Sequence, residues 1–256
     1  FNYVNGVYTL KEGVPDIQSN VFTNYPKPAE IQVPAGQSAF PGALKIKDTH
    51  KDGIINEEDA VELGNVMAHH TGGFGFSGNY KNFDFSANFT YQIGGKVYNA
   101  SAMCEYTGGK EPGIGKNKRD FIRDCFQLYD VRNGELVVVT DPTELAALNR
   151  NATRPVPYYE ANTVLSDFIE DASFLRLSNL TIGYSFPKTL LKKAYIQSAR
   201  VYVTGGNLFC ITGYSGLDPE VSTNGAAGNS GYPTPGLDYG SYPRSRTFTV
   251  GLNLTF

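Results

Sequence analysis

Arg244-Ser-Arg-Thr-Phe-Thr-Val-Gly-Leu-Asn-Leu-Thr-Phe256 is the stretch that decides the fold class, because small polar and apolar residues alternate without interruption from Thr247 to Phe256. Successive side chains of a β-strand point to opposite faces, so the stretch predicts a strand with one apolar face. That face comprises Phe248, Val250, Leu252, Leu254 and Phe256, and the other comprises Thr247, Thr249, Gly251, Asn253 and Thr255. The pattern fits a strand of a soluble sandwich and equally a strand of a transmembrane barrel, whose apolar face contacts lipid.

A second segment, Phe83–Ile93, alternates in the same way and indicates the length of the strands. At about 3.3 Å per residue it spans roughly 36 Å, and a tilt of about 45° reduces its rise to about 26 Å, close to the apolar band of an outer-membrane barrel. The segment 72–80 alternates too, and only Lys81 and Asn82 separate the two. These segments therefore predict a tight hairpin of membrane-spanning strands.

The order of short and long connections favours a barrel. Expected strands lie near residues 1–9, 72–80, 83–94, 173–186, 199–209 and 244–256. The connections 10–71, 95–172 and 210–243 are long, and those between the remaining strands are short. Short periplasmic turns and long extracellular loops are typical of outer-membrane barrels. Within 95–172, Leu136–Val139 predicts a short strand and 143–149, preceded by Pro142, a short helix.

The composition of the 256 residues excludes several classes of protein. The chain has 17 Tyr, 16 Phe, 28 Gly and 14 Pro, which is typical of β-rich, turn-rich proteins. A net charge of -3 argues against a nucleic-acid partner, which would require a basic surface. No run of about 18 apolar residues is present, which excludes a transmembrane helix. The chain has no Trp, so Tyr and Phe would have to supply any aromatic belt at a membrane interface.

The segment Asp48-Thr-His-Lys-Asp-Gly-Ile-Ile-Asn-Glu-Glu-Asp59 resembles a calcium loop of the EF-hand and dockerin type. In that interpretation Gly53 forms the sharp turn, whereas His50 departs from the pattern. The alternative interpretation is an Asp-Gly turn followed by an Asn-capped helical turn. The candidate ligands are Asp48, Asp52, Ile54 through its carbonyl, Asn56 and Asp59.

The three cysteines are too few for a disulfide framework, and their odd number would leave at least one of them unpaired within the chain. A bridge between Cys104 and Cys125 is one possibility, and three free thiols are the other.

Four segments in the second half of the chain carry a family resemblance. They are Ala172-Ser-Phe-Leu-Arg-Leu-Ser-Asn-Leu-Thr-Ile-Gly-Tyr-Ser-Phe-Pro187, Ala199-Arg-Val-Tyr-Val-Thr-Gly-Gly-Asn-Leu-Phe209, Tyr214-Ser-Gly-Leu-Asp-Pro-Glu220 and Tyr242-Pro-Arg-Ser-Arg-Thr-Phe248 with the strand that follows. With the acidic loop upstream, Pro41–Gly53, they resemble the C-terminal part of SusC/RagA-type TonB-dependent transporters of Bacteroidetes.

The resemblance implies an all-β fold, in which the chain supplies six or so antiparallel strands of a barrel of about 22 strands in the outer membrane of a Gram-negative bacterium. It implies import of oligosaccharides or peptides, energy from the TonB complex, a SusD-like surface lipoprotein as a lid, and no required cofactor beyond a possible structural calcium. Six strands cannot close a barrel, since about eight is the smallest number known. The chain is therefore expected to be a C-terminal piece that lacks the plug domain and pairs with the N-terminal remainder of the transporter.

The residues allow one alternative function and argue against another. A soluble all-β carbohydrate-binding module with an EF-like calcium loop would use loop tyrosines as stacking platforms. An enzyme is not expected, because no two carboxylates are placed together and no nucleophile motif is present. The substrate and the residues that bind it cannot be read from the sequence.

Overall fold

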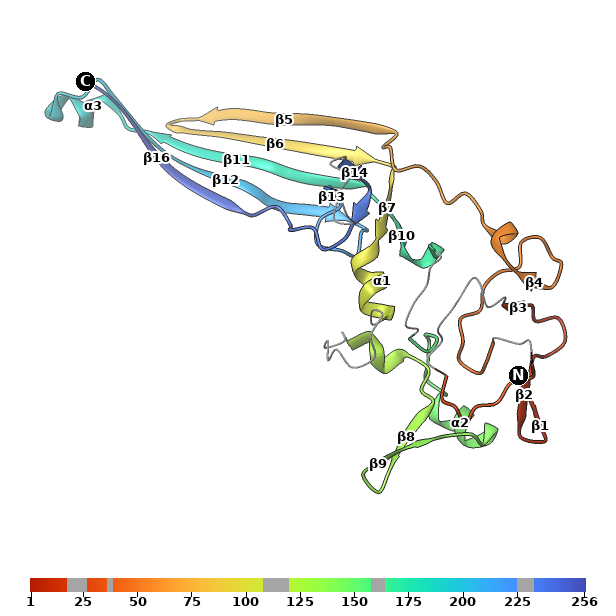
Figure 1. Cartoon of the computed structure of the whole chain (residues 1–256). Helices are drawn as coiled ribbons and strands as arrows, with labels where there is room; N and C mark the ends of the chain where they lie inside the picture. Colours follow the sequence, from red (N-terminus) through yellow and green to blue (C-terminus); the bar gives the residue numbers. More distant parts are fainter. Residues whose placement is uncertain (18–26, 36–38, 108–119, 158–163, 225–232) are drawn as a thin grey trace. The chain divides into compact units, whose positions relative to one another are not determined.

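The computed structural model describes residues 1–17, 27–35, 39–107, 120–157, 164–224 and 233–256. The chain forms two compact units, and Figure 1 colours them along the sequence. Unit 1 comprises Phe1–Glu62 and Ala102–Ser166, and unit 2 comprises Leu63–Ser101 and Asp167–Phe256. No helix among the described residues is long and apolar enough to cross a membrane.

The main element of unit 2 is a sheet of five long antiparallel strands in the order β16-β12-β11-β6-β5 (Figure 1). The tight hairpin expected at Lys81 and Asn82 is present, since Tyr80 pairs with Phe83 across it. The expected strand 199–209 is longer at its C-terminal end than the sequence indicated. The strands are β5 (His70–Tyr80), β6 (Phe83–Ile93), β11 (Phe174–Ser185), β12 (Ser198–Thr212) and β16 (Thr247–Thr255).

The prediction of a single strand over residues 1–9 is wrong. This segment forms a small hairpin of β1 (Asn2–Val4) and β2 (Val7–Thr9) in unit 1 and does not pair with the long sheet. Asn5 and Gly6 occupy its turn with φ of 52° and 82°. An Asn-Gly pair favours this two-residue turn, because both residues tolerate positive φ. The turn signal therefore outweighed the weak alternation of the flanking residues.

The register places the apolar residues of all five strands on one face. Val250 of β16 lies opposite Val203 of β12, Val203 lies opposite Ile182 of β11, and Ile182 lies opposite Phe85 of β6. An adjacent row on the opposite face is small and polar, and it consists of Thr249, Thr204, Thr181 and Ser86. The sequence did not reveal which face of the segment 199–209 is apolar, and the pairing assigns Val203 and the other odd positions from 199 to 205 to the apolar face.

A β-bulge in β11 keeps the apolar side chains of both halves of the strand on the same face of the sheet. Leu177 and Asn179 pair with consecutive residues of β6, so Ser178 has no partner there. The extra residue changes the side-chain parity along β11. Apolar positions are even-numbered from Leu180 onwards and odd-numbered up to Leu177, yet they form one continuous apolar face.

Unit 2 also contains smaller elements near the end of the sheet where β6 ends and β11 begins. Val97, Ala172 and Tyr214 are buried together beside a three-stranded sheet of order β10-β7-β15. These elements are β7 (Lys96–Asn99), β10 (Ile169–Asp171), β15 (Leu237–Asp238), and the paired strands β13 (Ser222–Asn224) and β14 (Pro233–Pro235). The β11–β12 connection holds α3 (Lys188–Leu191) and η4 (Lys192–Ala194).

Unit 1 packs short elements around a small core. The helix expected after Pro142 is present with Asp141 as its N-cap, and the expected strand near 136–139 pairs in a hairpin. The core residues are Tyr8, Ile31, Phe40, Leu128, Val139, Leu145 and Val156. The elements are β3 (Asp16–Ile17), β4 (Ile54–Ile55), η1 (Glu57–Asp59), η2 (Asp120–Asp124), β8 (Tyr129–Arg132), β9 (Glu135–Val138) and α2 (Pro142–Leu148). Two further helices, α1 (Ala100–Thr107) and η3 (Ser166–Phe168), have residues in both units.

The cysteines are free thiols, so the possible Cys104–Cys125 bridge is not formed. Cys125 is buried in unit 1, and this burial raises the pKa of its thiol. A buried, protonated thiol behaves as a small apolar side chain.

Candidate functional site

The apolar face of the five-stranded sheet is continuous, and no other described part of the chain covers it. Side chains in its rows remain largely accessible, with 73% of Phe248, 72% of Val250 and 61% of Phe76 exposed. Phe74 stacks on Phe89 of the neighbouring strand at a centroid distance of 5.1 Å, which adds cross-strand contacts on the same face. Burial of such a face in an apolar environment is favourable in proportion to its area. The geometry therefore requires an apolar medium or partner along the whole sheet.

The opposite face is polar and is linked across strands by side chains. The hydroxyl groups of Thr181 and Thr204 lie 2.9 Å apart. Arg200 of β12 reaches over Gly183 to bind both carboxylate oxygens of Asp84 on β6. A Cβ atom at position 183 would overlap this pair, so the glycine is required for the bridge. An ion pair on this face indicates a polar environment on this side of the sheet.

The same face carries a buried ion network where the bulge lies. Arg176 of β11 is 3% exposed and places Nη2 2.6 Å from Oδ1 of Asp218. Its Nε lies 2.9 Å from Oε2 of Glu220, close enough for an ion pair, although the N–H is not aligned for a hydrogen bond. The guanidinium also lies over the ring of Phe174, 5.4 Å from its centroid. A buried guanidinium is tolerated because two carboxylates compensate its charge.

The network also holds the segment that leads into the last strand. Arg244 binds Glu220, with Nη2 3.2 Å from Oε1. Asn207, at the β12 bulge with φ of 52°, accepts a hydrogen bond from Arg176 and donates one to the carbonyl of Arg244. The irregular backbone of β12 therefore serves to aim the Asn207 amide between the two arginines. Three parts of the chain far apart in sequence are fastened here, namely β11, the segment around Asp218 and the start of β16.

A second polar cluster lies beside the small sheet. The Tyr214 hydroxyl donates a hydrogen bond to Oδ2 of Asp238 over 2.5 Å. Burial, together with this carboxylate, strongly raises the pKa of Tyr214, so the phenol stays protonated and remains a donor. Glu170 accepts hydrogen bonds from the Ser215 backbone and from the Asn99 amide. These contacts satisfy the buried polar groups of the loop, which gives them a structural role.

The predicted calcium loop is folded on its own backbone. The carboxylate of Asp48 accepts hydrogen bonds from the N–H groups of Lys51 and Gly53, over 2.5 and 2.9 Å. Asp52 accepts one from the N–H of Ile54 over 2.9 Å. Gly53 has a φ of 86°, as the predicted sharp turn requires.

At the other end of the loop, Asp59 closes the turn. Asn56 caps η1 by accepting from the N–H of Glu58, and its own N–H donates to Asp59. The Asn-capped turn of the alternative interpretation is thus present. Asp59 also accepts from the N–H groups of Thr49 and His50. The hydrogen bonds from Asn56, His50 and Thr49 lower the pKa of Asp59 to about 2.

The loop therefore offers calcium oxygen atoms that already accept hydrogen bonds. Among the described residues, no group of three or more His, Cys, Asp or Glu side chains is arranged to hold a metal ion. A cation in this loop would have to draw Asp48, Asp52 and Asp59 together, using their remaining lone pairs. Calcium binding by this loop stays a prediction.

No family model matches the sequence. The chain is 32% identical over 216 residues to TonB-dependent receptor P3 of Formosa agariphila, covering 84% of the chain and 19% of the receptor. It is 43% identical over 90 residues to TonB-dependent receptor SusC of Bacteroides thetaiotaomicron, covering 35% of the chain and 8% of SusC. The RagAB peptide importer in its open-open state matches with a TM-score of 0.52 at 25% identity, over 75% of this chain and 17% of that one.

The chain is a relative of SusC/RagA-like TonB-dependent transporters. A second RagAB structure, described as a peptide transporter, matches with a TM-score of 0.53 at 26% identity. Three curated receptors match most of this chain, and the chain spans about a fifth of the length of each of them. Its all-β fold, with a five-stranded antiparallel sheet, is that of a portion of a SusC/RagA-like barrel.

The SusC/RagA-like motifs meet in space at the ion network. Arg176, Asp218 and Arg244 come from three of the four segments that carry the resemblance, and Asn207 comes from the fourth. The sequence alone does not show that these residues share a site. Arg176 is the signal in the sequence that points to this site. It lies at an otherwise apolar end of the predicted strand 173–186, and a charge there requires a partner of opposite charge.

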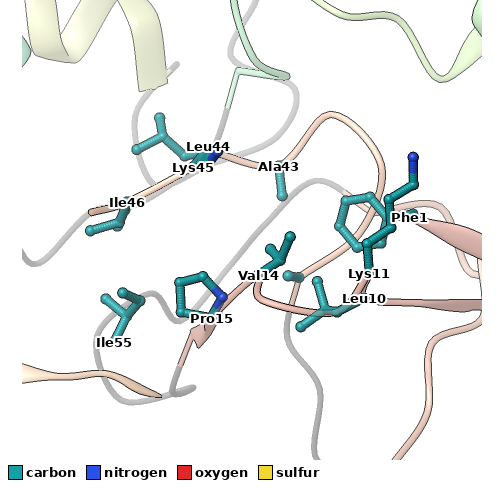
Figure 2. Close-up of a pocket in the computed structure, with 11 residues that line it drawn as sticks. Phe1, Leu10, Lys11, Val14, Pro15, Ala43, Leu44, Lys45, Ile46 and Ile55 are labelled. Atoms are coloured by element: carbon teal, nitrogen blue, oxygen red, sulfur yellow. The ribbon is translucent and has the colours of Figure 1, made fainter. Parts of the chain in front are cut away.

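Unit 1 of the SusC/RagA-like chain holds a separate pocket of about 190 Å³ (Figure 2). Side chains from the first hairpin region and from 43–46 line it, including Leu10, Val14 and Pro15, with Lys45 among them. The described residues that line the pocket include no His, Cys, Asp or Glu, so they offer no general acid, general base or nucleophile of these types.

Proposed function

We propose that this chain forms part of a TonB-dependent outer-membrane importer of oligosaccharides or peptides, which works with a SusD-like surface lipoprotein as its lid. In this role the chain contributes barrel strands and loops and performs no catalysis. The N-terminal plug and the remainder of the barrel would pair with it, and the TonB complex would act through that remainder.

The observation that carries the proposal is the two-sided sheet. Five strands present one uncovered apolar face, and the opposite face is polar and bridged by the Arg200–Asp84 ion pair. A barrel in a membrane needs this arrangement, with lipid outside and water inside. A soluble sandwich would need a second sheet to cover the apolar face. The relation to TonB-dependent receptors supports the same conclusion.

The edges of the sheet support the pairing with further barrel strands. β5 and β16 are the edge strands, and each leaves a row of backbone N–H and C=O groups unpaired within the sheet. Unpaired backbone groups at membrane depth are very costly, so barrels close on themselves. The proposal therefore predicts that both edges pair with strands that lie outside this sequence.

The decisive experiment recovers the chain from bacterial membranes. An affinity tag placed in the Asn133–Gly134 turn, which joins β8 and β9 in unit 1, leaves the long sheet undisturbed. We expect the tagged chain in the outer-membrane fraction, released only by detergent, together with further barrel polypeptide and a surface lipoprotein. A monodisperse protein that purifies without detergent would refute the proposal.

A transport measurement tests the energy source. Cells that produce the tagged importer would be given labelled oligosaccharide and labelled peptide mixtures in separate assays, with and without a functional TonB. Uptake of one class that is lost without TonB is expected. Equal uptake in both strains would contradict the TonB dependence while leaving the barrel assignment intact.

A further inference from the structure

The short connection between β11 and β12 has an unusual surface. It contains three exposed lysines within α3 and η4, namely Lys188, Lys192 and Lys193. They form no ion pair with any residue that the structure describes. Lysine ammonium groups are strongly hydrated point charges that bind phosphate oxygens well. The cluster is therefore a concentrated positive charge at one end of the sheet, with no described acidic side chain bound to it.

The surroundings add no negative side chain that could neutralise this charge. The stretches 79–85, 183–201 and 247–256 form this end of the sheet (Figure 1), and the only acidic side chain in them is Asp84. Both oxygens of Asp84 are bound by Arg200. Lys81, in the neighbouring turn, adds a further positive charge and lies 5.3 Å from the centroid of the Tyr80 ring.

Apolar side chains of the connection are also presented to the outside. Tyr195 is 91% exposed and has a φ of 58°, a left-handed conformation that glycine or asparagine usually occupies. A bulky residue in this conformation carries a conformational cost. Leu190, in the preceding helical turn, is 62% exposed. An exposed leucine and tyrosine beside three lysines match the composition of segments that lie in a membrane interface.

The connection continues the apolar face of the sheet. Phe83 and Tyr184 pack with ring centroids 4.8 Å apart, and Tyr184 contacts Phe186 at 5.3 Å. Phe186 immediately precedes Pro187, which is the N-cap residue of α3. Aromatic residues at the ends of barrel strands lie at the depth of the lipid headgroups. The lysines follow directly after this aromatic band, where the phosphate groups of the lipids would lie.

We propose that the connection 188–195 binds anionic phospholipid headgroups at the membrane surface. Lys188, Lys192 and Lys193 contact the phosphates, and Tyr195 and Leu190 insert between the lipids. This inference rests on the proposed function, because it takes the apolar face to contact lipid. The occupant is a phospholipid because positive charge and interfacial apolar residues occur together and continue the apolar face.

The first test measures lipid binding to the detergent-purified transporter that contains the chain. Native mass spectrometry would count adducts of phosphatidylglycerol, which is anionic, and of phosphatidylethanolamine, which has no net charge. The variant is K188Q/K192Q/K193Q, and the matched control is K45Q/K47Q/K51Q, which removes three lysines of unit 1.

Each lysine near an anionic surface contributes about fivefold to binding before screening by salt. For K188Q/K192Q/K193Q we therefore expect a loss of phosphatidylglycerol binding of roughly tenfold or more at low salt. The control should retain wild-type binding. No preference for phosphatidylglycerol in the wild type, or an equal loss in both triple variants, would overturn the inference.

The second test locates position 195 and does not depend on lipid counting. The chain contains no tryptophan, so Tyr195→Trp adds one fluorophore to it, and the wild type provides the background spectrum. In vesicles of phosphatidylethanolamine and phosphatidylglycerol, brominated lipids should quench the added emission. Tyr242→Trp is the control, because Tyr242 is 95% exposed in the segment before β16. Quenching of the variant at 195 by aqueous iodide alone would overturn the inference.

The outcomes separate this inference from the proposed function. If the chain were not membrane-embedded, the proposed function itself would be wrong. If it were embedded and bound both lipids equally, only the lipid inference would be wrong. If K188Q/K192Q/K193Q lost a bound periplasmic protein and kept its phosphatidylglycerol, the connection would be a protein docking site, and the inference would be refuted.

Discussion

Arg176 and Asp218 form a buried ion pair, with Nη2 and Oδ1 2.6 Å apart although 42 residues separate them in sequence. The pair fixes a long loop to the polar face of the sheet. Because Glu220 and Asn207 also contact Arg176, the loop is held by several contacts at one point. Removing the arginine would leave the buried carboxylate of Asp218 without its ion-pair partner, whereas Glu220 would keep Arg244.

We expect Arg176→Met to destabilise the attachment of this loop by about 3 kcal/mol or more, as for other broken buried ion pairs. Limited proteolysis of the segment 215–246 in the purified transporter would measure it as faster cleavage. Arg132→Met is the control, because Arg132 lies 2.6 Å from Glu144 on an exposed surface of unit 1. Equal protease resistance of the two variants would show that the buried network stabilises the attached loop no more than an exposed ion pair elsewhere does.

Gly251→Val should impair pairing of the last strand. A Cβ atom at this position would overlap the ring of Tyr202 on β12. We expect a lower fraction of folded barrel, read as a loss of heat-modifiable mobility in gel electrophoresis. The double variant G251V/Y202A should recover folding because it removes the overlapping ring. Failure of the second substitution to rescue would mean that the glycine serves another purpose.

Val250→Arg and Thr249→Arg compare the two faces of β16. Val250 lies in the apolar row and Thr249 in the polar row, at neighbouring depths. An arginine on the lipid face of a barrel costs about 2–4 kcal/mol near the bilayer centre, whereas a lumenal one is tolerated. Outer-membrane yield should therefore fall for V250R and stay near wild type for T249R. The reverse order would invert the assignment of the two faces.

The hydrogen bonds of Asp59 predict how the acidic loop responds to acid. Its pKa is lowered to about 2, below the value of about 4 in an unfolded chain. A depressed carboxyl pKa adds stability that is complete above the unfolded value and is lost as the pH falls through the folded value. The loop should therefore weaken between pH 4 and pH 2, measured as faster backbone amide exchange after correction for intrinsic rates. Asp59→Asn should exchange faster already at pH 6.

We propose weak calcium binding by the loop 48–59, in the millimolar range typical of extracellular modules. The carboxylates of Asp48, Asp52 and Asp59 already accept backbone hydrogen bonds, so a cation must rearrange them. Isothermal titration of the purified transporter should detect calcium binding that D48N/D59N abolishes. The absence of heat and of stabilisation at millimolar calcium would remove the site.

The sequence by itself determined the long strands and their two faces. The alternation in 83–93 and 244–256 is unbroken, and side-chain direction in a strand depends only on local backbone geometry. The Lys81–Asn82 turn and the Asn56 cap were predictable for the same reason, because each depends on neighbouring residues. The hairpin at Asn5 and Gly6 is local as well, because an Asn-Gly pair favours a two-residue turn with positive φ.

Only the tertiary structure decided how strands combine and which residues meet. The apolar face of β12 follows from its register with β11, which depends on backbone pairing between distant segments. The bulge at Ser178 reverses the parity of β11, which a strict period of two does not anticipate. Arg176, Asp218 and Arg244 form one network because the fold brings three segments together. Local patterns fix the direction of side chains, whereas long-range contacts depend on the packing of the whole chain.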